Sequence, residues 1–221
     1  RRGDQIVLRR LQPEAAADDE EAATDPDEDV SKPHLTARGA PFRRRHRLDG
    51  RIVVHGGRVE ADNGCEEMIE YFDSYASQNG EASLVLLGAK MMKVPDEPYL
   101  RLGGILPTRD RMAAFEAADV VVAPCPDDLC AETALESFAA GTPVLASARN
   151  AAAVEHCRRA NAGLYYTNRD EFVEGLRAIL SNDRLRAAMG RNGRQYVQQN
   201  FRWDNVVGRF ERLLTKVKSS K

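Results

Sequence analysis

Three stretches of the sequence combine glycine, charge and apolar side chains in ways that suit a phosphorylated ligand. In the first, HGGRVEADNG (55–64), Gly56 and Gly57 permit close approach of the backbone, and Arg58 offers a planar guanidinium that suits phosphate oxygens. A tight turn explains this stretch equally well. It is not a GxGxxG fingerprint, so the sequence does not predict an ordinary dinucleotide site.

The second stretch, PCPDDLCAET (124–133), leads from an apolar run into a predicted helix that begins near Leu129 to Ala131. The free N–H groups at such a helix start favour an anion. Asp128 suits two roles equally, that of the helix N-cap and that of a ligand contact. Glu132, on the same helix, is expected to be an exposed surface acid.

Glu136 follows Glu132 by one turn, and its neighbours Leu135, Phe138 and Ala139 are expected to be packed. A carboxylate at that depth needs a partner, because burying it without one is costly. The hydroxyls of a ribose would suit it, and a hydrogen bond within the protein is the alternative.

The third stretch, RLGGILPTRD (101–110), places two glycines before Ile105 and Leu106. An apolar edge and bare backbone groups at Gly104 could receive a base, although a plain loop is equally compatible with this composition. No GxxxxGK[ST] or GxSxG pattern occurs, which argues against P-loop phosphoryl transfer and serine hydrolysis. His55 and His156 are expected to be core or surface histidines.

Five short apolar runs would carry these stretches, and amphipathic segments separate them. Continuous apolar runs are typical of strands buried on both faces, as in parallel sheets, so the alternation predicts an α/β fold with a doubly wound parallel sheet. In such a sheet, ligands bind beyond the carboxyl ends of the strands. Two further helices with a break near Asn200 to Trp203 are expected at the end. The runs are RIVVHGG (51–57), SLVLLGA (83–89), VVVAPC (120–125), PVLASA (143–148) and GLYYT (163–167).

Residues 1–49 differ from residues 50–221, which form the expected domain. The early part is acidic, rich in alanine and nearly free of large apolar side chains, so it is expected to be a charged linker or insert, partly disordered. A basic cluster, residues 43–47, closes it. Either the cluster is a solvated linker, or it contacts an anionic membrane surface or an anionic acceptor.

Composition sets further bounds. The formal net charge of -2 gives no electrostatic case for nucleic-acid binding. The four cysteines form no CxxC pair, which favours reduced thiols in a cytoplasmic protein. No apolar run is long enough to span a bilayer, and the abrupt start suggests the later part of a longer polypeptide.

From about Arg51 to Leu214 the chain resembles the C-terminal, donor-binding domain of glycosyltransferase family 4, which has the two-domain GT-B architecture with Rossmann-like halves. Arg58 matches an arginine that binds the donor pyrophosphate in that family, while Asn63 stands where a lysine is expected. Asp128 and Glu136 keep the spacing of the family's two glutamates, with aspartate in the first position. The matching segments are GGRVEADNGCEEMIEYF (56–72), LVLLGAKMMKVPDEPYLRLGGILP (84–107), AADVVVAPCPDDLCAETALESFAAGTPVLAS (117–147) and NAGLYYTNRDEFVEGLRAIL (161–180).

The resemblance implies a retaining transferase that moves a hexosyl group from a UDP- or GDP-sugar to an acceptor. It implies neither metal nor cofactor besides this donor substrate, because a protein cation and a helix start supply the positive charge. The acceptor site would lie in an N-terminal domain. Arg58, Asp128 and Glu136 would be the catalytic residues. The substrate-binding residues would be Gly57, Asn63, Gly104, Ile105, Leu106, Cys130, Ala131, Glu132 and Thr133.

Two alternatives stay open. One is a non-catalytic nucleotide-binding or interaction module of the same fold, which the departures at Asn63 and Asp128 motivate. The other is a GT-B sugar-nucleotide epimerase or a phosphorylase.

Overall fold

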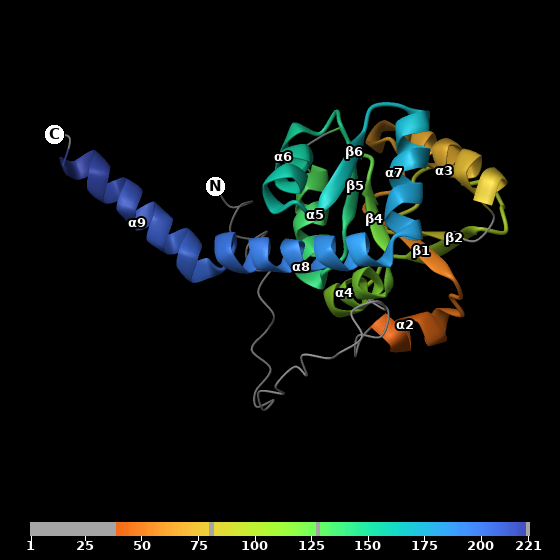
Figure 1. Ribbon diagram of the computed structural model, residues 1–221, viewed down its shortest axis with the longest axis horizontal. Coiled ribbons are helices and arrows are strands. Elements are labelled where there is room, and N and C mark those ends of the chain that lie inside the picture. The colour runs from red at the N-terminus through yellow and green to blue at the C-terminus, as the bar shows by residue number, and fades with distance from the viewer. Residues whose placement is uncertain (1–38, 80–81, 127–128, 220–221) are drawn as a thin grey trace.

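A computed structural model describes residues 39–79, 82–126 and 129–219, and Figure 1 shows their arrangement. Six parallel strands form one sheet in the order β3-β2-β1-β4-β5-β6. The prediction of a doubly wound parallel sheet is confirmed. The strands are β1 (Arg51–Gly56), β2 (Ala82–Leu87), β3 (Leu100–Gly104), β4 (Val120–Ala123), β5 (Val144–Ser147) and β6 (Gly163–Tyr166).

Helices cover both faces of the sheet (Figure 1). One core cluster lies between the sheet and α3 and α7, and the other lies between the sheet and α4, α5 and α6. The central strands β4 and β5 are buried along their whole length, which is why their sequence is continuously apolar. The helices are α2 (Gly39–His46), α3 (Cys65–Asn79), α4 (Thr108–Ala117), α5 (Leu129–Ala140), α6 (Ala151–Ala160), α7 (Arg169–Ser181), α8 (Asp183–Asn200) and α9 (Trp203–Ser219).

Helix α8 lies close against α5, and two glycines make this possible. A Cβ at Gly190 would stand 2.2 Å from the carbonyl oxygen of Gly141, and one at Gly193 would stand 3.0 Å from the ring of Phe138. Glycine inside a helix costs about 1 kcal/mol relative to alanine, and the close packing accounts for its presence here. The predicted break between the last two helices is confirmed, since α8 ends at Asn200 and α9 begins at Trp203.

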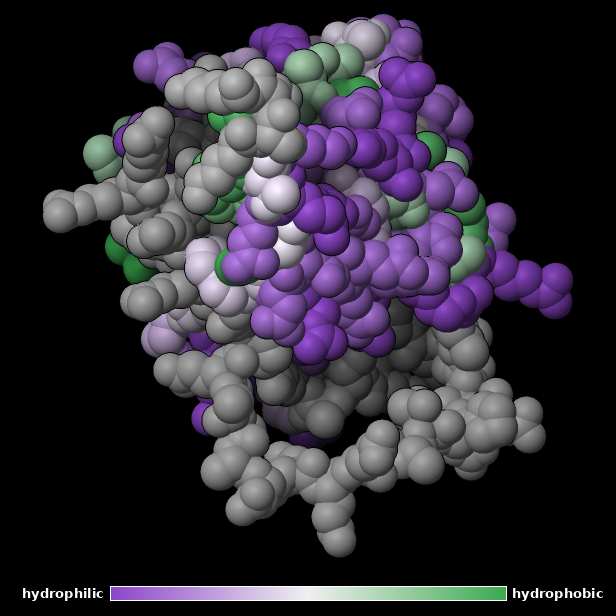
Figure 2. All heavy atoms as spheres, turned by 90° about the vertical axis from the view of Figure 1, so that its left-hand side faces the viewer, coloured by the Kyte–Doolittle hydropathy of each residue, from purple (hydrophilic) through white to green (hydrophobic). Residues whose placement is uncertain are grey.

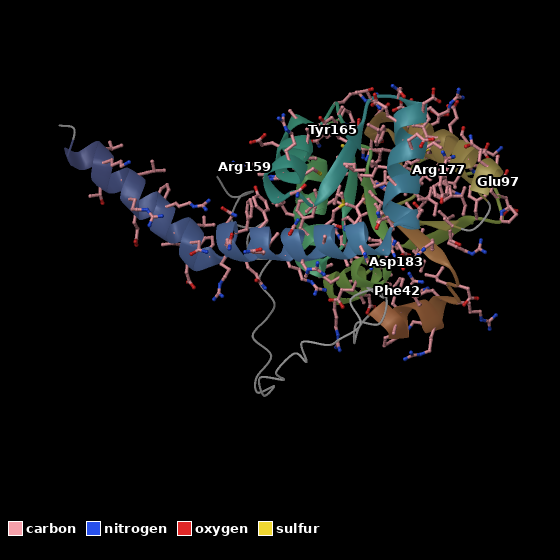
Figure 3. All side chains as sticks on the ribbon, viewed as in Figure 1. Phe42, Glu97, Arg159, Tyr165, Arg177 and Asp183 are labelled. Atoms are coloured by element: carbon pink, nitrogen blue, oxygen red, sulfur yellow. The ribbon has the colours of Figure 1, made fainter. Side chains whose placement is uncertain are left out.

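Residues 39–48, which the sequence assigns to the linker before residue 50, belong to the packed body. Helix α2 packs on α4, and Phe42 and Leu48 are buried in the core. Phe42 is labelled in Figure 3. The rest of the expected linker, residues 1–38, lies outside the described residues. In the part of the chain that the structure describes, no helix combines the length and the apolar character needed to cross a bilayer.

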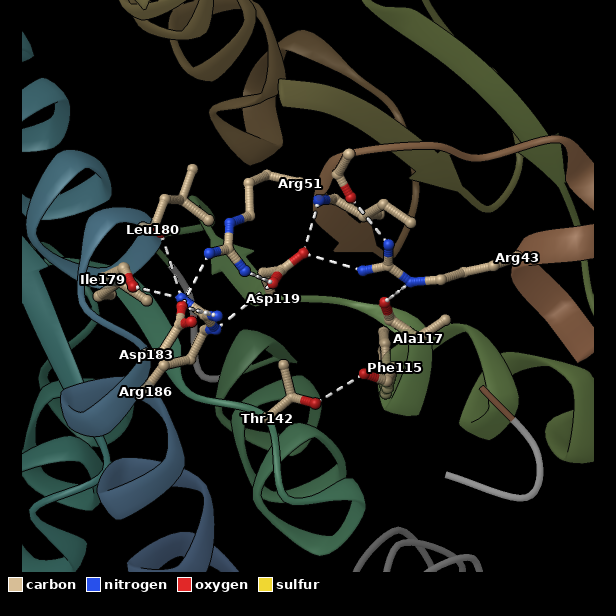
Figure 4. Close-up of polar contacts among 12 residues, drawn as sticks. Arg43, Arg51, Phe115, Ala117, Asp119, Thr142, Ile179, Leu180, Asp183 and Arg186 are labelled. Atoms are coloured by element: carbon tan, nitrogen blue, oxygen red, sulfur yellow. Dashed lines mark hydrogen bonds and ion pairs between the residues drawn. The ribbon is translucent and has the colours of Figure 1, made fainter. Parts of the chain in front are cut away.

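The amino ends of the central strands meet at Asp119, directly before β4 (Figure 4). Its side chain is only 1% exposed and accepts a hydrogen bond from the backbone N–H of Ile52 at 2.8 Å. Three arginines surround the same carboxylate: Arg43 at 2.9 Å, Arg51 at 3.0 Å and Arg186 at 3.4 Å. One buried acid therefore joins α2, β1, β4 and α8.

Arg186 is fully buried and also serves the end of α7. It donates hydrogen bonds to the carbonyl oxygens of Ile179 at 3.0 Å and Leu180 at 3.2 Å, at the negative end of that helix. Asp183 accepts from Arg186 at 2.6 Å, and this hydrogen bond lowers the pKa of the Asp183 carboxyl. Stability from this contact is therefore present above the ordinary pKa of an aspartate and is lost as the pH falls from there through the lowered pKa of Asp183.

Arg43 belongs to the basic cluster 43–47, and the structure assigns it a protein role. Besides Asp119, it binds the carbonyl oxygens of Ala117 at 2.9 Å and Gly50 at 2.8 Å. Arg44 and Arg45 are exposed, so the expected contact with an anionic surface stays a prediction for the exposed part of the cluster.

Replacement of Asp119 by asparagine should destabilise the fold strongly. Three arginines, one of them fully buried, would lose their shared counter-charge, and breaking a buried ion pair by removing one partner costs about 3–5 kcal/mol. Urea unfolding followed by circular dichroism measures the loss, because the only tryptophan, Trp203, lies in α9, outside this core.

The matched control is Glu155→Gln, since the ion pair of Glu155 with Arg159 on α6 is exposed on both sides (Arg159 is labelled in Figure 3). This control should cost less than about 1 kcal/mol. Equal losses for the two variants would contradict a central role for Asp119.

Candidate functional site

The loop after β1 forms backbone hydrogen bonds with the loop after β2. Gly57 N–H donates to the carbonyl of Leu87, and Val59 N–H donates to the carbonyl of Ala89, each at 2.9 Å. Met91 N–H returns a bond of 2.9 Å to the carbonyl of Val59. The carboxyl ends of the two strands are thus held side by side.

Glycine is required where these loops touch. Gly88 has a φ of +137°, and a Cβ there would stand 1.8 Å from the carbonyl oxygen of Gly57. No other residue type fits such an approach without moving the backbone. The predicted close approach at Gly57 is therefore seen, although its neighbour is protein backbone.

Arg58 projects from this loop with 58% of its side chain exposed, and it pairs with Glu60 at 3.0 Å. An exposed ion pair of this kind contributes little free energy, so a phosphate could compete for the guanidinium. The position suits the predicted role of Arg58.

The same loop also meets the loop after β4. Asn63 ends the short turn Ala61–Asn63, and its side-chain oxygen accepts a hydrogen bond of 3.7 Å from the thiol of Cys125. Gly64 has a φ of +72°, and a Cβ there would stand 2.7 Å from the carbonyl oxygen of Pro124. Two of the predicted stretches, 55–64 and 124–133, are therefore brought together.

Helix α5 begins at this junction. Thr133, in its first turns, donates a hydrogen bond of 3.0 Å to the carbonyl of Gly56, the last residue of β1. Ala131 is buried and Glu132 is half-buried, so Glu132 is not the exposed surface acid that the sequence predicts. Asp128 lies outside the described residues, as does the side chain of Cys130, so their predicted roles stay predictions.

Glu136 is 3% exposed, which agrees with the prediction of a buried carboxylate. Of the two partners that the sequence leaves open, the structure shows the protein one: the guanidinium of Arg111, from α4, forms an ion pair with the Glu136 carboxylate. Arg111 also lies over the ring of Phe115, at 5.5 Å from its centroid. That ring in turn lies against Gly56.

Sequence reasoning missed Arg111. Its signal is the four-residue spacing from Phe115, which places both side chains on the same face of α4. A charged residue on the buried face of a helix indicates a partner in the neighbouring element.

A hollow of about 570 Å³ lies beyond the carboxyl ends of β2 and β3. Gly104, with a φ of +67°, and the exposed Ile105 belong to its lining, and their predicted role as a base-binding edge stays a prediction. Leu106 does not line it and instead packs against the core. Lys90 lines it and was missed. The complete lining is Gly88, Ala89, Lys90, Leu102, Gly103, Gly104 and Ile105.

His55 is a core histidine, as predicted. Its ring nitrogens lie 3.4 Å from the carbonyl oxygen of Val122 and 3.4 Å from the sulfur of Cys65, and burial lowers its pKa. His156 is half-buried and contacts the hydroxyl of Tyr196 at 3.0 Å. Among the described residues, no three His, Cys, Asp or Glu side chains are grouped closely enough to hold a metal ion.

Comparison with known families places this geometry in context. The family model described as glycosyl transferases group 1 matches residues 40–196. The chain belongs to this family. The match begins within α2, which agrees with the packing of this helix against the body of the domain.

Curated relatives include a glycosyltransferase of Methanocaldococcus jannaschii, 27% identical over 171 residues that cover 72% of this chain and 43% of the relative. A GDP-mannose-dependent α-(1-6)-phosphatidylinositol monomannoside mannosyltransferase of Mycobacterium tuberculosis is 26% identical over 207 residues, or 85% of this chain and 53% of the relative. The chain thus spans about half the length of these relatives.

Solved structures share the fold and have the GT-B architecture. Sucrose-phosphate synthase from Thermosynechococcus elongatus superposes with a TM-score of 0.64 at 23% identity, over 82% of this chain and 49% of that one. The C-terminal domain of a glycosyl transferase group 1 protein from Francisella tularensis has a TM-score of 0.62 at 17% identity, over 74% of this chain and 92% of that domain. Anabaena HepE, in complex with UDP and glucose, gives 0.64 at 17% identity, over 83% and 52%.

Substitution of Arg111 by methionine should leave the Glu136 carboxylate buried without its cation. We expect a loss of about 2–3 kcal/mol in the free energy of unfolding, moderated by the partial exposure of Arg111. The double variant Arg111→Met, Glu136→Leu should recover most of this loss, because the uncompensated charge is then absent.

Urea unfolding of the two singles, the double and a control completes this cycle. Arg109→Met is the control, since Arg109 is exposed on the same helix, and it should change stability by less than about 0.5 kcal/mol. The importance of the pair is refuted if Arg111→Met behaves like Arg109→Met.

Proposed function

We propose that this chain is the donor-binding half of a retaining GT-B glycosyltransferase, which transfers a hexosyl group from a UDP- or GDP-sugar to an acceptor. One observation carries the proposal: in a group 1 glycosyl transferase, the loop that bears Arg58 contacts the loop that leads into α5. A guanidinium and the start of a helix thereby border the same edge of the sheet.

These two features suit a diphosphate leaving group. The N–H groups of the first turn of α5 have no partner within the helix and carry the positive end of its dipole. With Arg58 they would stabilise the charge that develops on the diphosphate as the sugar–phosphate bond breaks. Donors fixed before the reaction need no reorganisation during it, which is the source of their catalytic value.

Glu136 keeps its proposed role with the ribose despite its pairing with Arg111. An ionised carboxylate has about four acceptor sites, so it can bind an arginine and ribose hydroxyls together. Arg111 would hold the carboxylate in place so that its remaining acceptor sites receive hydrogen bonds from both hydroxyls. Asp128 would contact the sugar or its phosphate.

The base would lie in the hollow beside Gly104. Leu102 and Ile105 are exposed there and offer apolar surface to a flat ring, while bare backbone at Gly103 and Gly104 offers hydrogen bonds. Named relatives use GDP-mannose, and HepE is seen with UDP and glucose, so both bases merit testing.

Asn63 supports a second candidate, a non-catalytic nucleotide-binding module of the same fold. Its amide N–H groups can donate a hydrogen bond to a phosphate but supply no charge, while its side-chain oxygen accepts from the thiol of Cys125. In other enzymes, loss of one hydrogen-bond donor to the developing negative charge, as would follow from the missing lysine, costs about two to three orders of magnitude in rate. High activity of the full-length protein without a lysine at this position would exclude this alternative.

Helix α9 would contact the acceptor-binding half of the protein. It extends away from the sheet and its flanking helices (Figure 1). Figure 2 views the molecule from that side, where hydrophobic residues interrupt a mostly hydrophilic surface. Curated relatives are about twice as long as the stretch they share with this chain. We propose that an acceptor-binding half of the protein covers the exposed apolar residues of α9. The exposed apolar residues of α9 are Trp203, Phe210, Leu213, Leu214 and Val217.

Calorimetry with UDP, GDP and their sugar derivatives tests donor binding directly. Wild type should bind one of the two bases. Arg58→Ala should weaken that binding about tenfold to a hundredfold, because a charge-assisted contact is worth about 1.5–3 kcal/mol. Glu136→Gln should weaken it while keeping a group of the same shape.

Arg159→Ala is the matched control, because this exposed arginine lies at the C-terminal end of α6, away from the proposed donor site. The nucleotide affinity of this variant should equal that of wild type. Failure of wild type to bind any of these nucleotides would refute the proposal, and so would wild-type affinity in both site variants.

Phe210→Glu in the full-length protein should lower transfer at least tenfold while nucleotide affinity stays constant, because the charge would stand in the proposed contact between halves. Arg212→Glu, which lies on the opposite side of α9 by helical spacing, should have little effect. Product formation and calorimetry measure the two properties. Equal activity of the two variants would show that α9 does not make this contact.

A further inference from the structure

The hollow beyond β2 and β3 contains one charged side chain, that of Lys90. We propose that Lys90 is a positioning residue for the donor and supplies the second cation that binds the diphosphate of the nucleotide sugar. This inference rests on the proposed function and adds Lys90 to its donor site.

The backbone brings Lys90 next to the loop of Arg58. Lys90 is the bridge partner of Val59, and the hydrogen bonds of Val59 to Ala89 and Met91, each 2.9 Å, enclose it on both sides. Bridge partners in neighbouring strands lie about 5 Å apart. Arg58 directly precedes Val59, so the backbone of Lys90 lies beside the Arg58 loop, and the ammonium, on a stem of four carbons, would extend from there to the diphosphate.

The charge balance at this edge favours Lys90. The guanidinium of Arg58 is paired with Glu60, and that of Arg111 is paired with Glu136. Lys90 is exposed, and no carboxylate among the described residues lies within ion-pair distance of it. Its charge is thus uncompensated beside the hollow and is available to an anionic ligand.

The shape of the hollow agrees with this assignment. Leu102 and Ile105 provide exposed apolar surface, and the glycines leave the backbone bare. A ligand that joins a flat ring to an anion matches apolar walls with a cation at the rim. A diphosphate suits two cations better than one, since it carries charge on both phosphates.

A nucleotide series tests the assignment. Lys90→Met keeps the length of the stem and removes the charge. Affinity for the diphosphate, UDP or GDP, should fall about tenfold, and affinity for the bare nucleoside should stay within about twofold. The salt dependence of diphosphate binding should also weaken in this variant. Lys90→Arg should retain most of the affinity.

Lys93→Met is the matched control, because Lys93 is exposed three residues further along and does not line the hollow. It should bind like wild type, and unchanged thermal unfolding of both variants shows that the fold is intact. If wild type binds the diphosphate and Lys90→Met binds it equally well, this inference fails while the donor site stands. If Lys90→Met loses nucleoside and diphosphate affinity equally, Lys90 contacts the base and the assignment is wrong. If wild type binds no nucleotide, the proposed function fails.

Discussion

Close backbone contact at the carboxyl edge of the sheet is the constraint on which the candidate site depends. Glycine at positions 64 and 88 lets the loops after β1, β2 and β4 approach to distances that no side chain would allow. Because the loops touch, the loop of Arg58 lies beside Lys90 on one side and meets the start of α5 on the other, although these segments are far apart in sequence. Rigid backbone placement of this kind is what allows charge to be fixed before a ligand arrives.

The opposite edge of the sheet, at the amino ends of the strands, stabilises the fold. There, Asp119 and its three arginines join four elements through buried charge, and they form no part of the ligand region. Such a network is satisfied only when α2, β1, β4 and α8 are all in place, so it ties the sheet register to the helices around it. Polar residues thus fix the fold at one edge, and exposed polar residues are available for binding at the other.

The fold could be predicted from the sequence because continuous apolar runs and amphipathic spacing follow from burial on a parallel sheet. The predicted location of the candidate site rests on the same topology, and the structure brings two of the three predicted stretches together there. What could not be predicted were pairings between distant elements. Arg111 meets Glu136 from another helix, and Arg43 leaves its basic cluster to reach Asp119. Lys90 gave no signal, since a lysine after a strand is ordinary, and only the bridge to Val59 reveals its position.

The central claim is that a guanidinium, an ammonium and a helix start border a single diphosphate site. Nuclear magnetic resonance of the isotopically labelled chain, titrated with UDP and with GDP, tests it most directly, since every backbone amide reports. We predict that one of the two nucleotides shifts the amides of Arg58, Lys90, Gly104 and Ala131–Thr133 together, with a common affinity. Shifts confined to residues away from this edge, such as those of α6 and α8, would contradict the account.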